Sequence, residues 1–357
     1  MPHFSVAALL LTAVLSLISV QARALDVVAT IQPIKLLVAE ITDGVVEPKL
    51  LLPANTSPHD FQLKPSQRRT IQQADVIFWI GPDMEMALNK PLAQLDDHTL
   101  LVTLAEGALD SEKLHQEHDE HEAHEEHEAH QDHDEHKEND AHDEEHDHDE
   151  HEAHKEHAEH EENDHDDHAQ EAASHEHGHD HEHGEDLHLW LDPHEGERIA
   201  KLVAETLSQA DPNNRPKYQQ NLAEFLTDLE DLDKQLKQRL KPLSGKGYFV
   251  FHDAYNRFEA HYGLSHLGAI TISPERSPGA KHAAEIRERL IKNEAVCVFS
   301  EPQFPSPLVS NLIEGTDVGS GVLDPMGGQI AQGPKGYLRF LEQMAADFEA
   351  CLSQSNN

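Results

Sequence analysis

The chain has 357 residues, a formal net charge of −41 at pH 7 and 31 histidines. It has no basic stripe that could neutralise phosphates, which argues against a nucleic-acid-binding protein. The negative charge is concentrated in residues 115–186, where 32 acidic residues face only Lys137 and Lys155, a net charge of −30. The rest of the chain carries only −11, so its composition does not mark the whole protein as disordered.

The N-terminus predicts a secretory signal peptide over residues 1–24. An apolar run from Ala7 to Val20 ends in the small-x-small sequence Ala22-Arg23-Ala24. The run is shorter than the roughly 20 residues that cross a bilayer. No Lys or Arg precedes it, so a retained anchor is the alternative; no cysteine is near the cleavage site, so nothing there can be lipidated. We expect a free periplasmic protein.

Apolar runs alternate with helical segments before the acidic stretch. Pro33 opens the first helix and Gly44 follows its end, which is a typical pairing of start and stop signals. This alternation predicts βαβ units with a parallel sheet. The predicted strands are 25–31, 48–52, 75–80 and 99–104, and the later helices are 64–74 and 84–95.

Residues 115–186 contain 22 histidines among the acidic residues and no aromatic residue. Such a segment cannot form a core, so we predict a long flexible loop within the first half of the protein. Imidazole beside carboxylate suits weak binding of Zn²⁺ and, less selectively, Cu²⁺ or Ni²⁺; a plain solubilising linker is the alternative. Capture, sensing and buffering of zinc all remain open as roles. The histidines taken as auxiliary weak sites are His115, His118, His121, His124, His127, His130, His133, His136, His175, His177, His179, His181 and His183.

A second α/β run follows the acidic stretch. Residues 193–210 and 213–240 are predicted helices, and the second has apolar residues every three or four positions. We therefore predict an α/β fold of two lobes, each a parallel sheet flanked by helices, joined by one long rigid helix. The predicted strands here are 248–251, 264–270, 295–300 and 319–323, with helices at 279–292 and at the C-terminus. The expected domains are an N-terminal lobe at 25–211, a linking helix at 212–242 and a C-terminal lobe at 243–357.

Four candidate metal ligands follow predicted strands or begin a motif near one. His59 lies in the loop after strand 48–52, His188 begins a motif after the acidic stretch, His252 follows strand 248–251, and Asp324 follows strand 319–323. Ligands in α/β sheets bind outside the carboxyl ends of the strands, so two residues from each lobe would face one cleft.

Three neutral imidazoles with a carboxylate or water suit tetrahedral Zn²⁺, whereas Mn²⁺ prefers more oxygen donors. Taken alone, any one of these histidines could instead have an ordinary structural role. The shared position of three of them argues against a structural role. His194 is an intermediate case. We expect the other histidines of the folded part to be structural or on the surface: His98, His261, His266 and His282.

The chain contains only two cysteines, Cys297 and Cys351. In an oxidising compartment they could form a disulfide between a strand and the last helix, and two reduced buried thiols are the alternative. Neither lies in a C-x-x-C setting, which argues against reactive thiol chemistry.

Several motifs together resemble the metal-specific solute-binding proteins of ABC transporters, and within them the periplasmic zinc-uptake branch. The resemblance covers the whole mature chain. Its motifs are NTSPHD at 55–60, LKPS at 63–66, DLHLWLDP at 186–193, HDAY at 252–255, SPE at 273–275, PGA at 278–280, VFSEPQF at 298–304 and LDP at 323–325.

The resemblance implies a zinc ion between two lobes, with His59, His188 and His252 as ligands, and a disulfide between Cys297 and Cys351. Manganese-binding relatives have Glu where this chain has His252, and a histidine-rich loop is typical of the zinc branch. Some zinc-branch members have Glu directly before the first histidine. Because this chain has Pro58 there, Asp324 or a water is left as the fourth ligand.

The resemblance also implies a carrier that delivers zinc to a membrane permease driven by a cytoplasmic ATPase, usually as a monomer. Other periplasmic zinc-binding proteins are further possible partners. An enzyme is the rival, because three histidines and an open position can activate water. The chain has neither H-E-x-x-H nor G-x-S-x-G, so we expect no catalysis and no organic cofactor. A zinc buffer based on the histidine-rich stretch is the remaining alternative.

Overall fold

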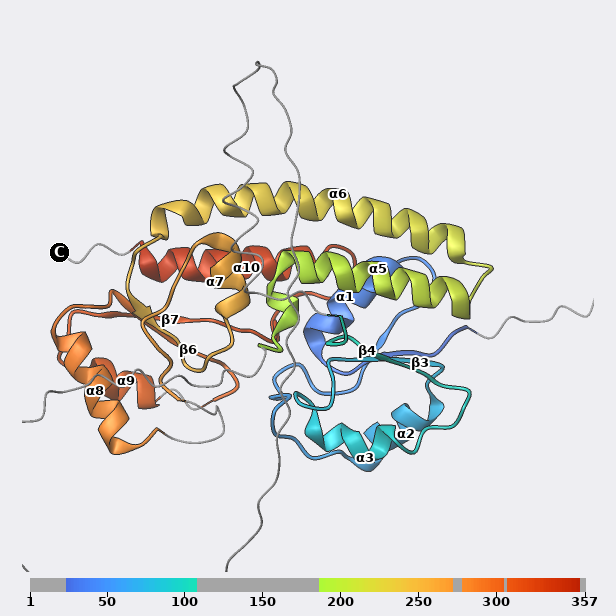
Figure 1. Cartoon of the computed structure of the whole chain (residues 1–357), viewed down its shortest axis with the longest axis horizontal. Coiled ribbons are helices and arrows are strands. Elements are labelled where there is room, and N and C mark those ends of the chain that lie inside the picture. Colours follow the sequence, from blue (N-terminus) through green and yellow to red (C-terminus); the bar gives the residue numbers. More distant parts are fainter. Residues whose placement is uncertain (1–23, 108–185, 272–277, 305–306, 354–357) are drawn as a thin grey trace, which may run out of the picture. The chain divides into compact units, whose positions relative to one another are not determined.

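A computed structural model describes residues 24–107, 186–271, 278–304 and 307–353 (Figure 1). The expectations for the signal peptide and for the histidine-rich stretch lie outside these residues, apart from their last positions. Two parallel sheets with flanking helices are present, so the predicted fold class is confirmed.

The first sheet has the strand order β2-β1-β3-β4, and each pairing is parallel. Strands β1 and β3 are apolar and buried throughout, as expected for central strands covered on both faces. Pro33 lies in the first turn of α1, and Gly44 follows that helix with φ of +73°, a conformation that suits glycine. The elements are β1 (Val27–Ala29), α1 (Gln32–Thr42), β2 (Lys49–Leu50), α2 (Pro65–Gln73), β3 (Val76–Trp79), η1 (Met86–Leu88), α3 (Asn89–Leu92) and β4 (Leu100–Thr103).

The predicted helix over 84–95 is wrong in length and type. The structure has a 3₁₀ turn, η1, followed by a single α-helical turn, α3. Pro91 explains the difference, because proline cannot donate the hydrogen bond that a continuous helix needs there and its ring clashes with the preceding turn.

Glu85 is a fully buried carboxyl beside the end of β3. Its Oε2 accepts a hydrogen bond from the backbone N–H of Ile80 at 2.6 Å, and Gly81 donates a second backbone hydrogen bond. Burial outweighs these hydrogen bonds and raises the pKa of Glu85 to about 7. The carboxyl of Glu85 therefore holds the turn after β3, but ionising it in this buried position lowers the stability of the protein.

We expect Glu85→Gln to stabilise the metal-free protein at about pH 8 but not at about pH 5. A carboxyl with a raised folded-state pKa favours folding below its unfolded pKa, and this stability is lost as the pH rises through about 7. The gain at the higher pH should be about 3 kcal/mol, since the pKa rises from 4.5 to about 7 and each pKa unit corresponds to about 1.4 kcal/mol. Urea unfolding of both proteins at both pH values measures the difference, and an equal difference at the two values would contradict the assignment.

The second sheet has the order β5-β6-β7, again with parallel pairing. The predicted strand 264–270 is only partly regular: residues 267–271 form backbone hydrogen bonds with residues 248–251, but the regular pairing is a single bridge between Ala269 and Val250. Gly268, with φ of +152°, interrupts the extended conformation. The elements of this part are η2 (Leu189–Leu191), α5 (Pro193–Ala210), α6 (Arg215–Leu240), η3 (Lys241–Leu243), β5 (Tyr248–Phe249), α7 (Asn256–Tyr262), α8 (Ala280–Ile291), β6 (Cys297–Ser300), α9 (Pro307–Ile313), β7 (Gly319–Val322) and α10 (Gly336–Leu352).

Helix α6 has 26 residues and runs along α5 and α10 (Figure 1). At 1.5 Å per residue its length is about 40 Å. In the first half of α6, the side chain of Asn221 donates hydrogen bonds to the backbone carbonyls of Ile41 and Asp43, at 2.8 and 2.9 Å. Near its other end, Arg239 pairs with Glu349 of α10 at 2.7 Å. The helix is thus fixed to elements from both halves of the sequence.

The C-terminal helix α10 also contacts both halves. It packs against β7 and against α1. The carboxylate of Glu40 in α1 accepts hydrogen bonds from the backbone N–H groups of Lys335 and Tyr337, at 2.8 and 3.0 Å. Gly336 lies so close to Leu36 that a Cβ atom would approach its side chain to 2.8 Å. The start of α10 therefore favours glycine at position 336 and is held by the first half of the chain.

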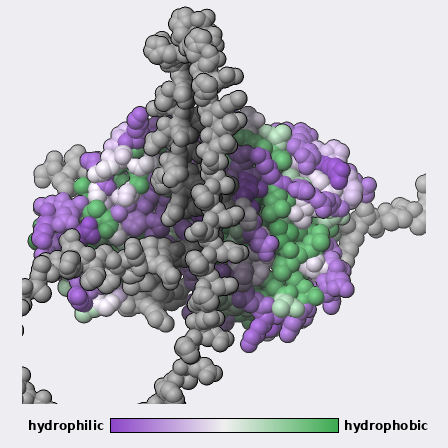
Figure 2. Space-filling view, viewed as in Figure 1, coloured by the Kyte–Doolittle hydropathy of each residue, from purple (hydrophilic) through white to green (hydrophobic). Residues whose placement is uncertain are grey.

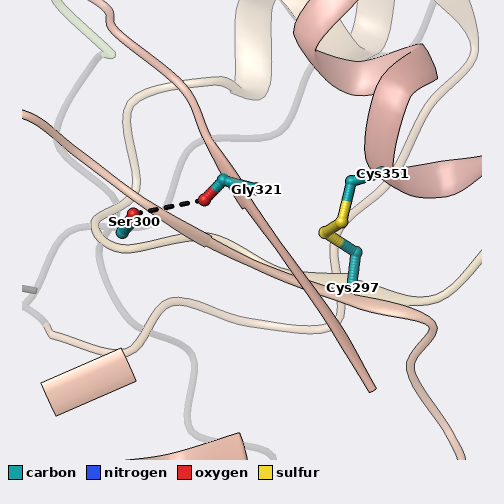
Figure 3. The surroundings of a disulfide bond; sticks show 4 residues. All are labelled: Cys297, Ser300, Gly321 and Cys351. Atoms are coloured by element: carbon teal, nitrogen blue, oxygen red, sulfur yellow. Dashed lines mark hydrogen bonds between the residues drawn. A yellow bond between two sulfur atoms is a disulfide. The ribbon is translucent and has the colours of Figure 1, made fainter. Parts of the chain in front are cut away.

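A disulfide joins Cys297 of β6 to Cys351 of α10 (Figure 3), as predicted. The neighbouring strand β7 passes close by: a Cβ atom on Gly321 would lie 2.6 Å from Phe299 and 3.2 Å from the Cβ of Cys351. The hydroxyl of Ser300 also donates to the carbonyl of Gly321 at 3.2 Å. The disulfide thus fastens α10 onto a tightly packed part of the second sheet.

Apolar side chains gather on one part of the visible surface, over β3 and β4 (Figure 2). Leu100 and Leu101 of β4 are large apolar residues that are 46% and 38% exposed. β4 is an edge strand of the first sheet. In the part of the chain that the structure describes, no helix is both long and apolar enough to cross a membrane.

Candidate metal centre

Three histidines converge from loops at the two sheets. His59 comes from the loop after β2, His188 directly precedes η2, and His252 follows β5. One ring nitrogen from each lies within 4.8 Å of the others, and the Nε2 atoms of His188 and His252 are 3.4 Å apart. Ring centroids are separated by 5.3 to 5.8 Å. The structure therefore brings together the three histidines that the sequence selected.

The histidines line a small and mostly apolar cavity. His188 and His252 are each only 6% exposed, and Pro58, Phe304 and Met326 complete much of the lining. The cavity volume is about 10 Å³, which is close to the space that one water molecule occupies. A single ion fits this space.

Carboxylates orient two of the three rings. The Nδ1 of His188 lies 2.8 Å from Oδ1 of Asp186, and the Nδ1 of His252 lies 2.7 Å from Oε1 of Glu301. A carboxylate accepts a hydrogen bond from the protonated ring nitrogen, so the other nitrogen is unprotonated and has a lone pair that can bind a cation. In both rings that nitrogen is Nε2, which faces the other histidine. This arrangement is typical of metal-binding histidines.

His59 supplies the third nitrogen. Its Nε2 is buried and has no hydrogen-bond partner among the described residues. Burial, and then the nearby His188 and His252, lower the pKa of His59 to about 3, so its ring is neutral near pH 7. Leaving a buried polar atom unpaired costs about 1–3 kcal/mol, and a bound cation would remove this cost.

The orienting carboxylates are themselves held. Arg257, which is 1% exposed, donates from Nε to the backbone carbonyl of Asp186 at 2.6 Å. Burial would raise the pKa of Asp186, but the charge of His188 and its hydrogen bonds outweigh it, and the pKa lies below its usual range. Tyr255 donates its hydroxyl to Oε1 of Glu301 at 3.1 Å.

The roles of Asp186 and Glu301 were not predicted from the sequence. Glu301 directly follows β6, so the strand-end rule that selected His252 also applies to it. Asp186 is two residues before His188, and its role depends on a local turn that the sequence pattern does not reveal.

Asp324 has a different position. Its Oδ1 accepts hydrogen bonds from Gln303 at 2.7 Å and from the backbone of Met326 at 3.1 Å. Its Oδ2 accepts one from the backbone of Gly328 at 2.7 Å. It is not among the residues whose ligand atoms meet within 4.8 Å. In this structure the carboxylate organises the loop after β7 beside the centre.

Comparison with known proteins shows the family. Residues 27–351 match the family described as the periplasmic zinc-uptake complex component A, ZnuA. The chain belongs to this family. The ZnuA proteins named "High-affinity zinc uptake system protein" include one from Haemophilus influenzae, 40% identical over 329 residues, which spans 92% of this chain and 93% of that protein. Another, from Yersinia pestis, is 35% identical over 328 residues and covers 91% of each chain.

Solved structures show that the fold is shared with known proteins. A crystal structure of a ZnuA protein is 22% identical and aligns with a TM-score of 0.64 over 94% of this chain and 100% of that chain. The periplasmic zinc-binding protein TroA from Treponema pallidum is 18% identical, with a TM-score of 0.65 over 92% and 99% of the two chains. The ZnuA family consists of periplasmic binding components of transport systems, which confirms the expectation of a transport protein rather than an enzyme.

Three other histidines of this ZnuA-family chain lie away from the centre. The side chain of His98 is 53% exposed. The Nδ1 of His266 lies 2.7 Å from Glu259, and the Nε2 of His282 lies 3.0 Å from the backbone carbonyl of Ala269. These surroundings agree with surface and structural roles.

We expect Glu301→Gln to weaken zinc binding by about 10–100-fold, because loss of the carboxylate makes the His252 ring a poorer donor. Glu259→Gln is the matched control, since Glu259 orients His266 outside the centre. Competition with a zinc chelator of known affinity measures both variants. Equal affinities of the two variants would show that Glu301 does not tune the centre.

Proposed function

We propose that this chain is the periplasmic zinc-binding component of an ABC importer and that it binds Zn²⁺ through His59, His188 and His252. The observation that carries the proposal is the convergence of three buried ring nitrogens, two of them aimed by carboxylates. Zinc uptake is also what the names of its relatives state. Zinc is here the cargo, and no residue is proposed to catalyse a reaction.

The donor set favours zinc over harder cations. Three imidazoles suit Zn²⁺ at distances of about 2.0–2.1 Å, whereas Mn²⁺ and Mg²⁺ favour oxygen ligands. The oxygens of Asp186 and Glu301 that hold the rings are already hydrogen-bonded to them. Nitrogen is therefore the main donor that the cavity offers.

We propose water as the fourth ligand. Asp324 is the other candidate from the sequence, but both of its oxygens accept hydrogen bonds from Gln303 and the loop after β7. Its oxygens are not among the ligand atoms that lie within 4.8 Å of one another, so binding through Asp324 would require its carboxylate to move toward the three histidines. Water needs no such change.

Delivery of zinc to a membrane permease, powered by a cytoplasmic ATPase, follows from the proposed role. We propose two lobes, residues 25–211 and 243–357, with the linking helix at 212–242, and a monomeric carrier. The indole of Trp190 donates to the carbonyl of Pro325 at 2.7 Å and so connects the two lobes beside the centre. Because α6 and α10 contact both halves, we expect little hinge opening, and release should depend on contact with the permease.

Export and the histidine-rich stretch complete the proposal. We propose that residues 1–24 are a signal peptide removed on entry to the periplasm. We also propose that the histidines between 115 and 183 bind zinc weakly and assist its capture or sensing. Both segments lie outside the described residues, and the proposal for them is based on sequence pattern alone.

Zinc titration by calorimetry on three forms tests the proposal. The forms are the mature chain, a chain lacking residues 115–183, and that deletion with His59→Ala. A carrier should keep one tight site in the deletion and lose it with His59→Ala. If tight binding disappears with the deletion alone, the protein is instead a zinc buffer based on its histidine-rich stretch.

A further inference from the structure

A second group of possible metal ligands lies in the described part of the chain. It consists of Asp192, His194 and His261, whose ligand atoms lie within 4.8 Å of one another. The two imidazole rings are 4.7 Å apart and nearly perpendicular, at 86°. The group shares no residue with the candidate metal centre.

The ends of two helices create this group. Asp192 is the N-cap of α5, and its Oδ1 accepts a hydrogen bond from the backbone N–H of His194 at 2.9 Å. His194 is the second residue of α5, so the cap holds its Cα close to the carboxylate. His261 is in the last turn of α7, which places its ring against the start of α5.

His261 is oriented in the same way as the histidines of the first centre. Its Nε2 lies 2.6 Å from Oδ1 of Asp233 in α6, while its Nδ1 lies 3.8 Å from Oδ1 of Asp192. When the ring donates its Nε2 proton to Asp233, the lone pair of Nδ1 faces Asp192 and His194. The carboxylate outside and the free nitrogen inside are typical of a metal-binding histidine.

The burial of these side chains and their access to solvent both suit a metal site. Asp192 is 1% exposed and the side chain of His261 is 3% exposed, so two of the donors are fixed in a packed environment. His194 is only partly buried, which leaves a path from solvent.

Two features oppose a cation here. The N-terminus of α5 carries a partial positive charge, worth about 0.3–1 kcal/mol against a cation. Lys237 lies 3.0 Å from Oδ2 of Asp233 and neutralises part of its charge. The group is surrounded by two carboxylates, Asp192 and Asp233, and by one lysine, so the net local charge still favours a positive ion.

We propose that Asp192, His194 and His261 form a second site for a zinc-class divalent cation on this protein. Two imidazoles, one carboxylate and a water would complete a tetrahedral set. The site is weaker than the first centre because it has one imidazole fewer and is partly open to solvent. It fills after the first centre and gives the folded body a capacity of two ions.

Anomalous X-ray scattering at the zinc edge, on crystals of the full mature chain grown with excess zinc, tests the proposal. We expect one peak among His59, His188 and His252 and a second among Asp192, His194 and His261. His194→Gln and His261→Gln should each abolish the second peak and keep the first, which also shows that the variants fold. His282→Gln, which removes a histidine bound only to a carbonyl, should keep both peaks.

A measurement in solution tests whether the second ion also binds outside the crystal. In the full chain labelled with ¹⁵N-histidine, the ring signals of His194 and His261, assigned with the two glutamine variants, should shift after one equivalent of zinc has filled the first centre. No second peak, or no such shift, would overturn the proposal and leave His261 as an ion-pair partner of Asp233. His59→Ala should remove the first peak and keep the second, so failure of the proposed function and failure of this site are distinguishable.

Discussion

Replacing His252 by alanine is expected to abolish tight zinc binding while the protein stays folded. The variant loses one of three nitrogen ligands and the ring that Glu301 orients. Changes to orienting residues alone cost about 10–100-fold in metal affinity, so loss of a ligand should cost about 1,000-fold or more. At one equivalent of zinc, competition with a tight chelator measures this loss without a contribution from weak sites.

His266→Ala is the matched control for His252→Ala. His266 is also held by a carboxylate in the same half of the chain, but it lies outside both groups of converging ligands. It should bind zinc like the unchanged protein. Thermal unfolding of both metal-free variants tests whether they fold, because His252→Ala leaves Glu301 buried with fewer partners. Retention of tight binding by a folded His252→Ala variant would remove His252 from the centre.

The sequence predicted the order of most elements because the strands are short apolar runs between clear helix signals. Helices α1 and α5 begin and end close to their predicted positions, where Pro33, Gly44 and Asp192 mark the boundaries. Prediction failed where a single residue changes the backbone. Pro91 prevents a continuous helix over 84–95, and Gly268 limits the regular pairing of the predicted strand 264–270 to one bridge.

His59 and His252 could be predicted because position along a strand determines position at the sheet edge, whereas His188 was selected by the motif that it begins after the acidic stretch. Their orienting partners could not be identified as readily. The hydrogen bond from His252 to Glu301 joins residues 49 positions apart and depends on how β5 and β6 pair. His261 was expected to be structural for the same reason, since its neighbour Asp192 comes from a different helix.

In both groups of ligands, a carboxylate contacts a ring nitrogen of a histidine and so orients the ring. In the first centre, Asp186 and Glu301 select which ring nitrogen is unprotonated, and this choice is made before metal arrives. Ligands fixed in advance lose less entropy on binding, so we expect affinity to follow this orientation.

Removal of the disulfide, by Cys297→Ala with Cys351→Ala, is expected to lower the free energy of unfolding by about 2–5 kcal/mol. The bond closes a loop with a sequence separation of 54 and fastens α10 to β6. Most of this loss arises because the unfolded chain gains conformational freedom. Urea unfolding of the metal-free protein measures it.

Zinc binding should change much less than stability in this double variant. Glu301 lies at the opposite end of β6 from Cys297, and pairing with β5 and β7 still holds the strand. Reduction of the unchanged protein with a thiol should reproduce the loss of stability and have no effect on the double variant. A double variant that unfolds like the unchanged protein would mean that the packing of α10 against α1, α6 and β7 is sufficient without the disulfide.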